Sequence, residues 1–362
     1  MKILHITLDF GDGGAEKFVV HLSNEQVKQN DVTVCSFWDL REEDYFHNQL
    51  HPNVKFISLG KRKGFDIAIF LKVYRLLKEV KPDIVHSHRS VVNYLVLFTI
   101  LFKNIRFIHT IHNDAFKETQ SRLIRFVKNI FFKVGLIRPV TISEDSHKSF
   151  KAAYSSNATL IYNGIPMPTK SSHFDDVKKE VNKLKISINT KVLLNIARIS
   201  TQKNHELLVN VTNRLIDEGY DIVLLVIGKL DKSIIDDRSM SNDRINFLGS
   251  KGNATDYLFF ADAFCLSSLY EGMPISLIEA LAVSCVPVVT PAGGVKDMIT
   301  DKLNGFISSG FGYNSYHETL KTFLNSESEL VQEIKNHCIM DYEKIYNISN
   351  TNQNYLKLYE QG

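Results

Sequence analysis

The segment from Ala261 to Gly294, ADAFCLSSLYEGMPISLIEALAVSCVPVVTPAGG, constrains the fold of this chain more than any other. Apolar runs at 263–266 and 286–290 have the length of buried strands. Between them, a loop leads into a helical pattern that runs to about residue 284. This order of strand, loop, helix and strand predicts a βαβ unit, and therefore a parallel sheet.

Two carboxylates accompany the start of this helical pattern. Glu271 lies in the loop and Glu279 within the helix, while Gly272 lets a ligand approach the backbone and Pro274 suits the first helical turn. The free N–H groups at the helix start therefore form a candidate phosphate seat. The alternative is that Ser276 and Glu279 form a capping box and that Glu271 is simply solvated.

Length and composition indicate a two-domain globular enzyme. The chain has 362 residues, of which 44% are hydrophobic and 23% charged. Residues 1–165 hold 23 Lys and Arg against 16 Asp and Glu, whereas the remaining residues hold 20 against 24. This asymmetry favours an anionic surface or ligand for the first half.

Cysteine usage and hydropathy favour a cytoplasmic protein. The four cysteines are scattered without a CxxC pair, which indicates buried thiols in a reducing compartment. The first apolar run, Ile3–Phe10, contains polar residues and is typical of a strand, not of a signal peptide. The longest apolar tract, Val91–Phe102, has 12 residues, fewer than the ~20 that a membrane-spanning helix needs.

Strand and helix patterns alternate along the chain and restart after a polar linker. A strand at 2–9 is followed by a glycine loop, Gly11–Glu16, and a helix; a similar strand, loop and helix begin at Lys191. We therefore predict an α/β fold with two Rossmann-like domains. The loop spacing is not GxGxxG, which disfavours a dehydrogenase. Gly13 and Gly14 either hold a ligand against the backbone or form an ordinary tight turn.

Polar residues follow several strands of the first half. In parallel sheets, ligands bind at the carboxyl ends of strands, so we expect these groups to hydrogen bond a ligand and not to bind a metal. The residues are His86–Arg89, His109, His112–Asp114, Ser143, Glu144, Asn163 and Gly164.

A helical pattern from about Phe116 to Val134 mixes Lys and Arg with apolar residues. A basic amphipathic helix of this kind binds anionic membrane surfaces. The alternative is a core helix with a solvated basic face.

In the second half, two cations flank the first loop. Arg198 and Lys203 follow the strand that begins at Lys191, and two cations near a helix start can clamp a diphosphate. Each of them could instead form a surface ion pair.

Together these segments resemble the retaining GT-B glycosyltransferases of family 4. Glu271 and Glu279, in EGMPISLIEAL, resemble the Glu-x7-Glu signature of the family. Other family motifs are resembled, in the expected order, by Gly13–Glu16, Thr110–His112, Asn163-Gly164, Ala197-Arg198 with Lys203, and Phe247–Gly249.

The resemblance implies two Rossmann-like domains that face each other across a cleft. The N-terminal domain, 1–165, would bind the acceptor, and the C-terminal domain, 166–345, the nucleotide-sugar donor. A C-terminal helix, about 346–362, would cross back to the first domain.

The resemblance also implies roles for individual residues. Arg198 and Lys203 would bind the donor diphosphate, and Glu279 the ribose. Glu271 would contact the sugar hydroxyls, and His112 the sugar near its reacting carbon. Further donor-binding residues would be Gly13, Gly14, Phe247, Leu248, Gly272, Met273, Pro274 and Ile275. No metal ion, cofactor or DxD motif would be required, and Asp231, Asp236 and Asp237 lack a supporting motif.

The implied reaction is transfer of a hexose or N-acetylhexosamine, with retention, from a nucleotide-sugar to a lipid-linked glycan in surface polysaccharide biosynthesis. UDP is the preferred nucleotide, and the enzyme would be peripheral at the inner face of the cell membrane. One alternative is a sugar-nucleotide epimerase, which would need acid and base residues that this set does not provide. The other is a catalytically silent subunit that binds a nucleotide-sugar, which the intact cations and glutamates disfavour.

Overall fold

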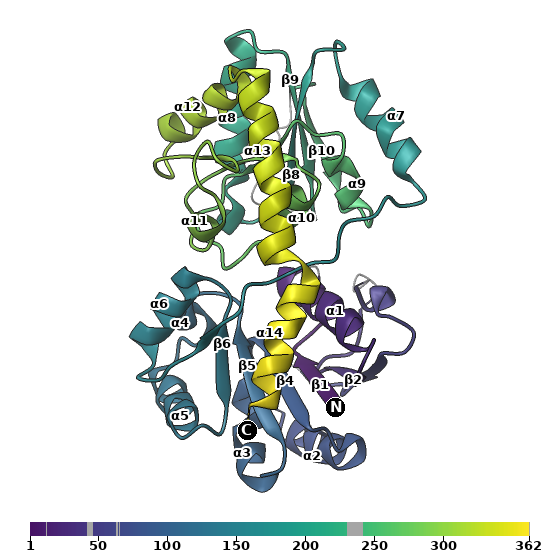
Figure 1. Ribbon diagram of the computed structural model, residues 1–362, viewed down its shortest axis with the longest axis vertical. Coiled ribbons are helices and arrows are strands. Elements are labelled where there is room, and N and C mark those ends of the chain that lie inside the picture. The colour runs from purple at the N-terminus through teal and green to yellow at the C-terminus, as the bar shows by residue number, and fades with distance from the viewer. Residues whose placement is uncertain (12, 42–45, 63, 65, 230–241, 362) are drawn as a thin grey trace. The chain divides into compact units, whose positions relative to one another are not determined.

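The computed structural model describes residues 1–361 except 12, 42–45, 63, 65 and 230–241. The chain forms two compact units (Figure 1). Unit 1 contains Met1–Pro166 and Ile345–Gly362, and unit 2 contains Met167–Lys344. The sequence had placed these boundaries after residue 165 and at about residue 346. Each unit is an α/β domain built on a parallel sheet, as predicted.

The described residues of unit 1 form a seven-stranded sheet in the order β3-β2-β1-β4-β5-β6-β7. Its strands are β1 Lys2–Thr7, β2 Asp31–Ser36, β3 Lys55–Ser58, β4 Ile84–His88, β5 Arg106–Ile111, β6 Arg138–Thr141 and β7 Thr159–Leu160. Its helices include α1 Gly14–Gln26, α2 Ala68–Val80, α3 Val92–Leu101, α4 Ala115–Glu118, α5 Arg122–Lys133, α6 Glu144–Ala153 and α14 Ile348–Glu360.

The described residues of unit 2 form a six-stranded sheet in the order β10-β9-β8-β11-β12-β13. Its strands are β8 Lys191–Ile196, β9 Ile222–Ile227, β10 Ile245–Gly249, β11 Ala263–Leu266, β12 Val286–Val289 and β13 Phe306–Ile307. Its helices include α7 Phe174–Leu184, α8 His205–Asp217, α9 Ala254–Leu258, α10 Ile275–Ala282, α11 Val295–Met298, α12 Tyr313–Leu324 and α13 Ser328–Asp341. A π-helical turn, η5 Tyr342–Tyr346, precedes α14.

Most residues of the central strands are buried because helices cover both sides of each sheet. In β9, for example, all six residues are buried. Both sheets reverse their strand order once: between β1 and β4 in unit 1, and between β8 and β11 in unit 2. Such a reversal splays two loops apart at the carboxyl ends of adjacent strands, which is where doubly wound domains bind ligands.

Helix α14 returns the end of the chain to unit 1, where it lies across β4 and β5 (Figure 1). Its Tyr355 and Tyr359 are fully buried. The Arg106 guanidinium donates a hydrogen bond of 2.7 Å to the carbonyl oxygen of Tyr359. Gly164 lies so close to the start of α14 that a Cβ there would meet the Asn347 carbonyl oxygen at 2.8 Å.

The helix expected from Phe116 to Val134 is wrong as a single element. The structure has α4 and α5 there, separated near Thr119. The Asp114 carboxylate accepts from the backbone N–H groups that begin α4, and the Ser121 hydroxyl accepts from that of Ile124 in α5. Each N-cap starts its own helix, so the chain cannot continue one helix through both.

The structure can be compared with two expectations from the sequence, the burial of the thiols and the lack of a membrane-spanning helix. All four cysteines are buried free thiols, which confirms their predicted burial. Among the described residues, no helix combines the length and the apolar character that a bilayer crossing requires.

We predict that Gly164→Ala destabilises the protein by ~1–3 kcal/mol, the usual cost of forcing extra atoms into a packed site. The reason is that the new methyl group meets the backbone of Asn347, the N-cap of α14, which cannot move without disturbing the helix. Urea unfolding measures the effect. Gly252→Ala is the matched control, since a Cβ there has no neighbour within 4 Å; equal midpoints for the two variants would contradict the prediction.

Candidate active site

The strand reversal of unit 2 brings Lys203 and Glu271 together. The Lys203 Nζ lies 2.6 Å from the Glu271 Oε1, which also accepts from the Ser268 hydroxyl at 2.6 Å. The two charged side chains are 18% and 6% exposed. A cation and a carboxylate predicted from separate motifs therefore form one partly buried pair.

The loops that carry this pair are bonded to each other. The Leu269 N–H donates to the Gln202 carbonyl, and the Gln202 amide donates to the Tyr270 carbonyl, both at 2.8 Å. The Ser267 hydroxyl contacts the carbonyl oxygen of Lys203 at 3.0 Å. These bonds fix the loop after β8 against the loop after β11, and so fix the distance between Lys203 and Glu271.

Helix α10 starts one residue later than expected, because Pro274 is its N-cap and has an extended backbone. The alternative capping box is wrong, since the N-cap position holds proline and has no side-chain cap. Glu279 lies inside the helix, is 5% exposed, and accepts from the Thr255 hydroxyl of α9 at 3.1 Å. The two glutamates therefore contact different neighbours.

Other predicted donor-site residues occupy the same edge. Arg198 is exposed, and no side-chain partner is recorded for it within the described part of the chain. Phe247 and Leu248 lie in β10, where the pairing with β9 shifts by one residue after Phe247. This irregularity leaves Leu248 without a strand partner. The segment containing Gly272, Met273, Pro274 and Ile275 is buried.

The reversal in unit 1 carries a different charged group. The Arg89 guanidinium, after β4, pairs with the Glu16 carboxylate and lies 3.3 Å from the Asp9 carboxylate. Burial raises the pKa of Glu16, although Arg89 opposes that rise. Gly13 is the N-cap of α1 and Gly14 is its first residue. The predicted glycine loop thus begins a helix at the strand reversal.

The expectation that polar strand ends contact a ligand is wrong for most of the histidines. His86, His88 and His109 are fully buried and bond to other protein groups. His5, which the sequence analysis passed over, is equally buried and lies 3.1 Å from His88. Of the predicted histidines, His112 keeps partial exposure, and its Nε2 lies 3.0 Å from the Nδ1 of His88.

His109 belongs to a separate buried cluster. Its Nδ1 lies 3.1 Å from the Ser87 hydroxyl and its Nε2 lies 2.8 Å from the Glu118 carboxylate. Burial alone would raise the pKa of Glu118, but His109 and then Lys128 outweigh it and lower this pKa to about 2. Ser87 is 2% exposed and also donates to the Ile108 carbonyl. This cluster is therefore structural and not a nucleophilic triad.

Burial keeps the central histidines neutral. It lowers the pKa of His5 to about 4 and that of His112 to about 3, and it holds those of His86 and His88 well below the usual value. Each of these imidazoles therefore carries one N–H donor and one lone pair at neutral pH.

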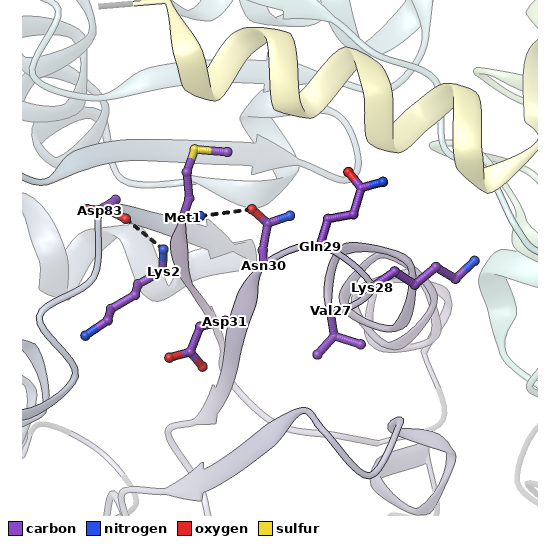
Figure 2. A pocket seen from close by; sticks show the side chains of 8 residues that line it. All are labelled: Met1, Lys2, Val27, Lys28, Gln29, Asn30, Asp31 and Asp83. Carbon is purple, nitrogen blue, oxygen red and sulfur yellow. Dashed lines mark hydrogen bonds between the residues drawn. The ribbon is translucent and has the colours of Figure 1, made fainter.

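A surface hollow is found at the opposite edge of the unit 1 sheet (Figure 2). Its lining is Met1, Lys2, Val27–Asp31 and Asp83. Lys2 and Asp31 begin their strands, and ligands of parallel sheets bind at the other end. The lining groups also bond to one another: the Asn30 side chain contacts the chain terminus and the Asp83 carboxylate accepts from the Lys2 N–H. We therefore do not take this hollow as the active site.

Solved structures share the fold along the whole chain. Anabaena HepE in complex with UDP aligns with a TM-score of 0.80 at 17% identity, covering 99% of each chain. WaaG, a glycosyltransferase involved in lipopolysaccharide biosynthesis, aligns with a TM-score of 0.75 at 12% identity, covering all of both chains. The architecture is thus that of the GT-B glycosyltransferases.

Family profiles match most of the sequence. Residues 12–167 match the profile described as Glycosyltransferase Family 4, and residues 176–338 match the one described as Glycosyl transferases group 1. The chain belongs to the group 1 glycosyltransferases, as the ordered motifs had indicated.

Curated relatives span nearly the same length. The UDP-Gal:alpha-D-GlcNAc-diphosphoundecaprenol alpha-1,3-galactosyltransferase of Escherichia coli is 25% identical over 85% of this chain and 84% of its own. A diphospho-undecaprenol-glycan alpha-1,4-N-acetyl-D-galactosaminyltransferase of Campylobacter jejuni is 24% identical over 99% of this chain and 98% of its own. The glycosyltransferase CapH of Staphylococcus aureus, from capsular polysaccharide biosynthesis, is 22% identical over 99% of this chain and 98% of its own.

We predict that the free energy of unfolding decreases as the pH falls from 7 to 5. In the unfolded chain, histidine has a pKa near 6.5, whereas in the folded chain that of His5 is about 4. Between these values the unfolded state binds more protons, so acid favours unfolding. The slope approaches ~1.4 kcal/mol per pH unit for each such histidine.

Urea unfolding at pH 7 and pH 5 measures this dependence. His5→Phe removes one of the buried imidazoles. It should therefore reduce the slope of unfolding free energy against pH by up to ~1.4 kcal/mol per pH unit. A slope that is equally steep in the variant, or a wild-type stability that does not fall in acid, would show that these histidines are not held neutral.

Proposed function

We propose that this glycosyltransferase moves a hexose or N-acetylhexosamine from a UDP-sugar to a lipid-linked glycan acceptor in surface polysaccharide biosynthesis, with retention of anomeric configuration. The observation that carries the donor part of the proposal is the order of the predicted residues along the edge of the unit 2 sheet. Phe247 belongs to β10, Arg198 and Lys203 follow β8, and Glu271 follows β11, in the spatial order β10-β9-β8-β11.

This order matches the parts of a nucleotide-sugar. Base, diphosphate and sugar would lie at β10, β8 and β11 respectively. Three strand spacings of ~4.8 Å separate the outer two strands, which gives an extended ligand room to lie along the edge. Glu279, held on the β10 side by Thr255 of α9, would contact the ribose.

The proposed chemistry is stabilisation of a leaving diphosphate. The bond between the anomeric carbon and the phosphate oxygen breaks, a bond from that carbon to the acceptor oxygen forms, and the acceptor hydroxyl proton passes to the departing diphosphate. Negative charge therefore develops on the diphosphate. Arg198, Lys203 and the start of α10 would supply positive charge and N–H donors there, so the proposal requires no metal ion.

Lys203 must exchange partners in this proposal. In the structure its ammonium is paired with the Glu271 carboxylate. A bound diphosphate would compete for the ammonium, and the Glu271 carboxylate would then turn to the sugar hydroxyls while retaining its bond from Ser268. Binding the donor would thus convert a resting ion pair into two ligand contacts.

From unit 1, we propose that His112 contacts a hydroxyl of the transferred sugar and that Gly13 and Gly14 approach the diphosphate through their backbone. His112 is held neutral and partly exposed, which suits a hydroxyl contact. Gly14 is exposed at the start of α1, which leaves its backbone open to a ligand.

Relatives support the donor and acceptor classes. The Escherichia coli relative is named for UDP-Gal and for a diphosphoundecaprenol-linked sugar, and solved structures of Anabaena HepE contain UDP or UDP-glucose. The Campylobacter jejuni relative is named for a glycan linked to the same type of lipid. We therefore propose a polyprenyl-diphosphate glycan as acceptor.

A surface of unit 1 fits an acceptor that resides in a membrane. Helix α5 exposes Leu123 and Phe126 by 72% and 63%, whereas it buries Lys128, a distribution that favours a membrane contact over a core helix with a solvated basic face. Helix α3 contacts α5 and exposes Leu97 and Leu101 by 58% and 65%. Exposed Lys103, Arg122 and Lys133 accompany this apolar surface.

Exposed apolar side chains together with exposed cations are suited to an anionic bilayer surface. We propose that the helices α3 and α5 place the enzyme peripherally at the inner face of the cell membrane, in contact with the cytoplasm.

Lys203→Ala and Glu271→Gln are each expected to lower turnover by about 10²-fold or more, the scale of a lost transition-state contact. Release of nucleotide from a panel of UDP-, GDP- and ADP-sugars, with thermal shift as a binding test, would identify the donor. Lys191→Ala is the matched control, because Lys191 pairs with Asp262 at the opposite end of β8. Wild-type turnover in both site variants would refute the assignment.

For the membrane surface, Leu123→Ser combined with Phe126→Ser should weaken binding to anionic vesicles at least about tenfold, because burying one large apolar side chain contributes ~1.5–3 kcal/mol. Co-sedimentation with anionic and with neutral vesicles measures it. Met340→Ser is the control, since Met340 is 59% exposed on α13 of unit 2. Equal binding of the wild type to both vesicle types would count against the anionic surface.

A further inference from the structure

We propose that Gln26, acting through His5 and His88, sets the tautomer of His112, so that His112 carries its proton on Nε2 and offers a lone pair on Nδ1. Gln26, His5 and His88 are then positioning residues. The catalytic meaning of this tautomer rests on the role proposed above for His112, whereas the tautomer itself does not.

The four side chains form an unbroken hydrogen-bonded row inside unit 1. The Gln26 Oε1 lies 2.7 Å from the His5 Nε2, the His5 Nδ1 lies 3.1 Å from the His88 Nε2, and the His88 Nδ1 lies 3.0 Å from the His112 Nε2. Gln26, His5 and His88 are fully buried, so water does not reach the row from their side.

The row has a direction because a carbonyl oxygen can only accept. The Gln26 oxygen requires the proton of His5 on Nε2, which leaves a lone pair on the His5 Nδ1. His88 must therefore donate from Nε2 and accept at Nδ1. His112 must in turn donate from Nε2, and its Nδ1 is left as an acceptor. One amide oxygen thus fixes the proton position on three rings.

This logic requires that every ring is neutral. Burial lowers the pKa of His5 to about 4 and that of His112 to about 3, and it keeps that of His88 well below its usual value. A protonated ring would donate from both nitrogens and break the row at the next ring. At neutral pH each imidazole in the row therefore has one nitrogen that donates and one that accepts.

The other end of the Gln26 amide faces a hydroxyl, which can accept the hydrogen bond that this orientation requires. Its Nε2 donates to the Tyr359 hydroxyl at 3.4 Å, and that hydroxyl lies 2.7 Å from the Nδ1 of His86. The Nε2 of His86 lies 2.7 Å from the Thr110 hydroxyl. Since the amide nitrogen donates, Tyr359 is free to donate to His86, and His86 to Thr110. Rotating the amide would reverse the donors in the row to His112.

The same histidines do not make a good metal centre. Nitrogen atoms of His5, His86 and His88 lie within 4.8 Å of one another. However, both nitrogens of His86 face hydroxyl groups at 2.7 Å, and both nitrogens of His5 and of His88 are within bonding distance of a partner. A metal ion would have to displace these bonds, so the geometry points to a hydrogen-bonded row.

The tautomer of His112 determines which kind of hydrogen bond this side chain can make to a ligand. No partner is recorded for its Nδ1 within the part of the chain that the structure describes. A lone pair there accepts a hydrogen bond from a ligand hydroxyl, and it cannot donate one to a ligand oxygen. In the proposed reaction His112 therefore receives a hydrogen bond from the donor sugar and does not act as a general acid.

Nitrogen-15 NMR of the histidine side chains tests the proposal without any enzymatic assay. In the folded wild-type protein at pH 7, we expect the Nε2–H tautomer at His5, His88 and His112. Gln26→Leu removes the carbonyl acceptor and should leave His112 with both tautomers populated, although residue 26 does not contact it. Ser87→Ala is the control, since Ser87 lies between His86 and His88 but bonds to His109; its His112 should keep the wild-type tautomer.

The Nδ1–H tautomer at His112 in the wild type would overturn the proposal, and so would an unchanged tautomer in a folded Gln26→Leu protein. If that variant does not fold, His5→Phe interrupts the row at its next member and should have the same effect. Coordinated shifts of His5, His86 and His88 on adding Zn²⁺ would also overturn it, in favour of a metal centre.

Activity gives a second and separate readout. Gln26→Leu should lower kcat by about twofold to tenfold, the range of one neutral hydrogen bond, while Ser87→Ala leaves it unchanged. If the wild-type protein transfers no sugar, the proposed function is wrong, but the tautomer proposal is unaffected. If NMR shows the other tautomer at His112, the tautomer proposal is wrong, but the proposed function is unaffected.

Discussion

The reversal of strand order between β8 and β11 is the constraint on which the candidate donor site depends. The loops that follow these two adjacent strands are joined by the Lys203–Glu271 pair. A pair as buried as this loses much of its Coulomb gain to desolvation, so it adds little to stability. The pair instead holds a cation and a carboxylate together at the carboxyl ends of β8 and β11, where doubly wound domains bind ligands.

At the strand reversal of unit 1, neutral hydrogen-bonded side chains stabilise the structure alongside the charged ones. Burying several histidines is costly unless each ring nitrogen is bonded, because unpaired polar groups pay the full desolvation penalty. Helix α14 meets part of this requirement, since the Tyr359 and Tyr355 hydroxyls bond to His86 and Thr110. Helix α14 therefore completes a hydrogen-bond network that starts in β1.

The sequence predicted the strands and their parallel arrangement because buried strands appear as short apolar runs, as in 263–266. The prediction failed where a single polar side chain determines the start of a helix. Ser121 begins a new helix inside a segment whose apolar pattern is periodic throughout. The charged donor-site residues were found from loop position and family resemblance. His5 was not, because a histidine within an apolar strand carries no periodic signal, and only the tertiary fold shows that it meets Gln26 and His88.

The structure of unit 2 shows what the sequence separation between Glu271 and Glu279 does. Seven residues separate Glu271, in the loop after β11, from Glu279, inside α10, and this path turns the second carboxylate away from the first. Glu271 meets Lys203, whereas Glu279 meets Thr255 of α9, which follows β10. Two carboxylates that shared one proton would have to touch. These two are held by different neighbours, so they do not form an acid–base pair, and in the function proposed above they would contact two parts of one ligand.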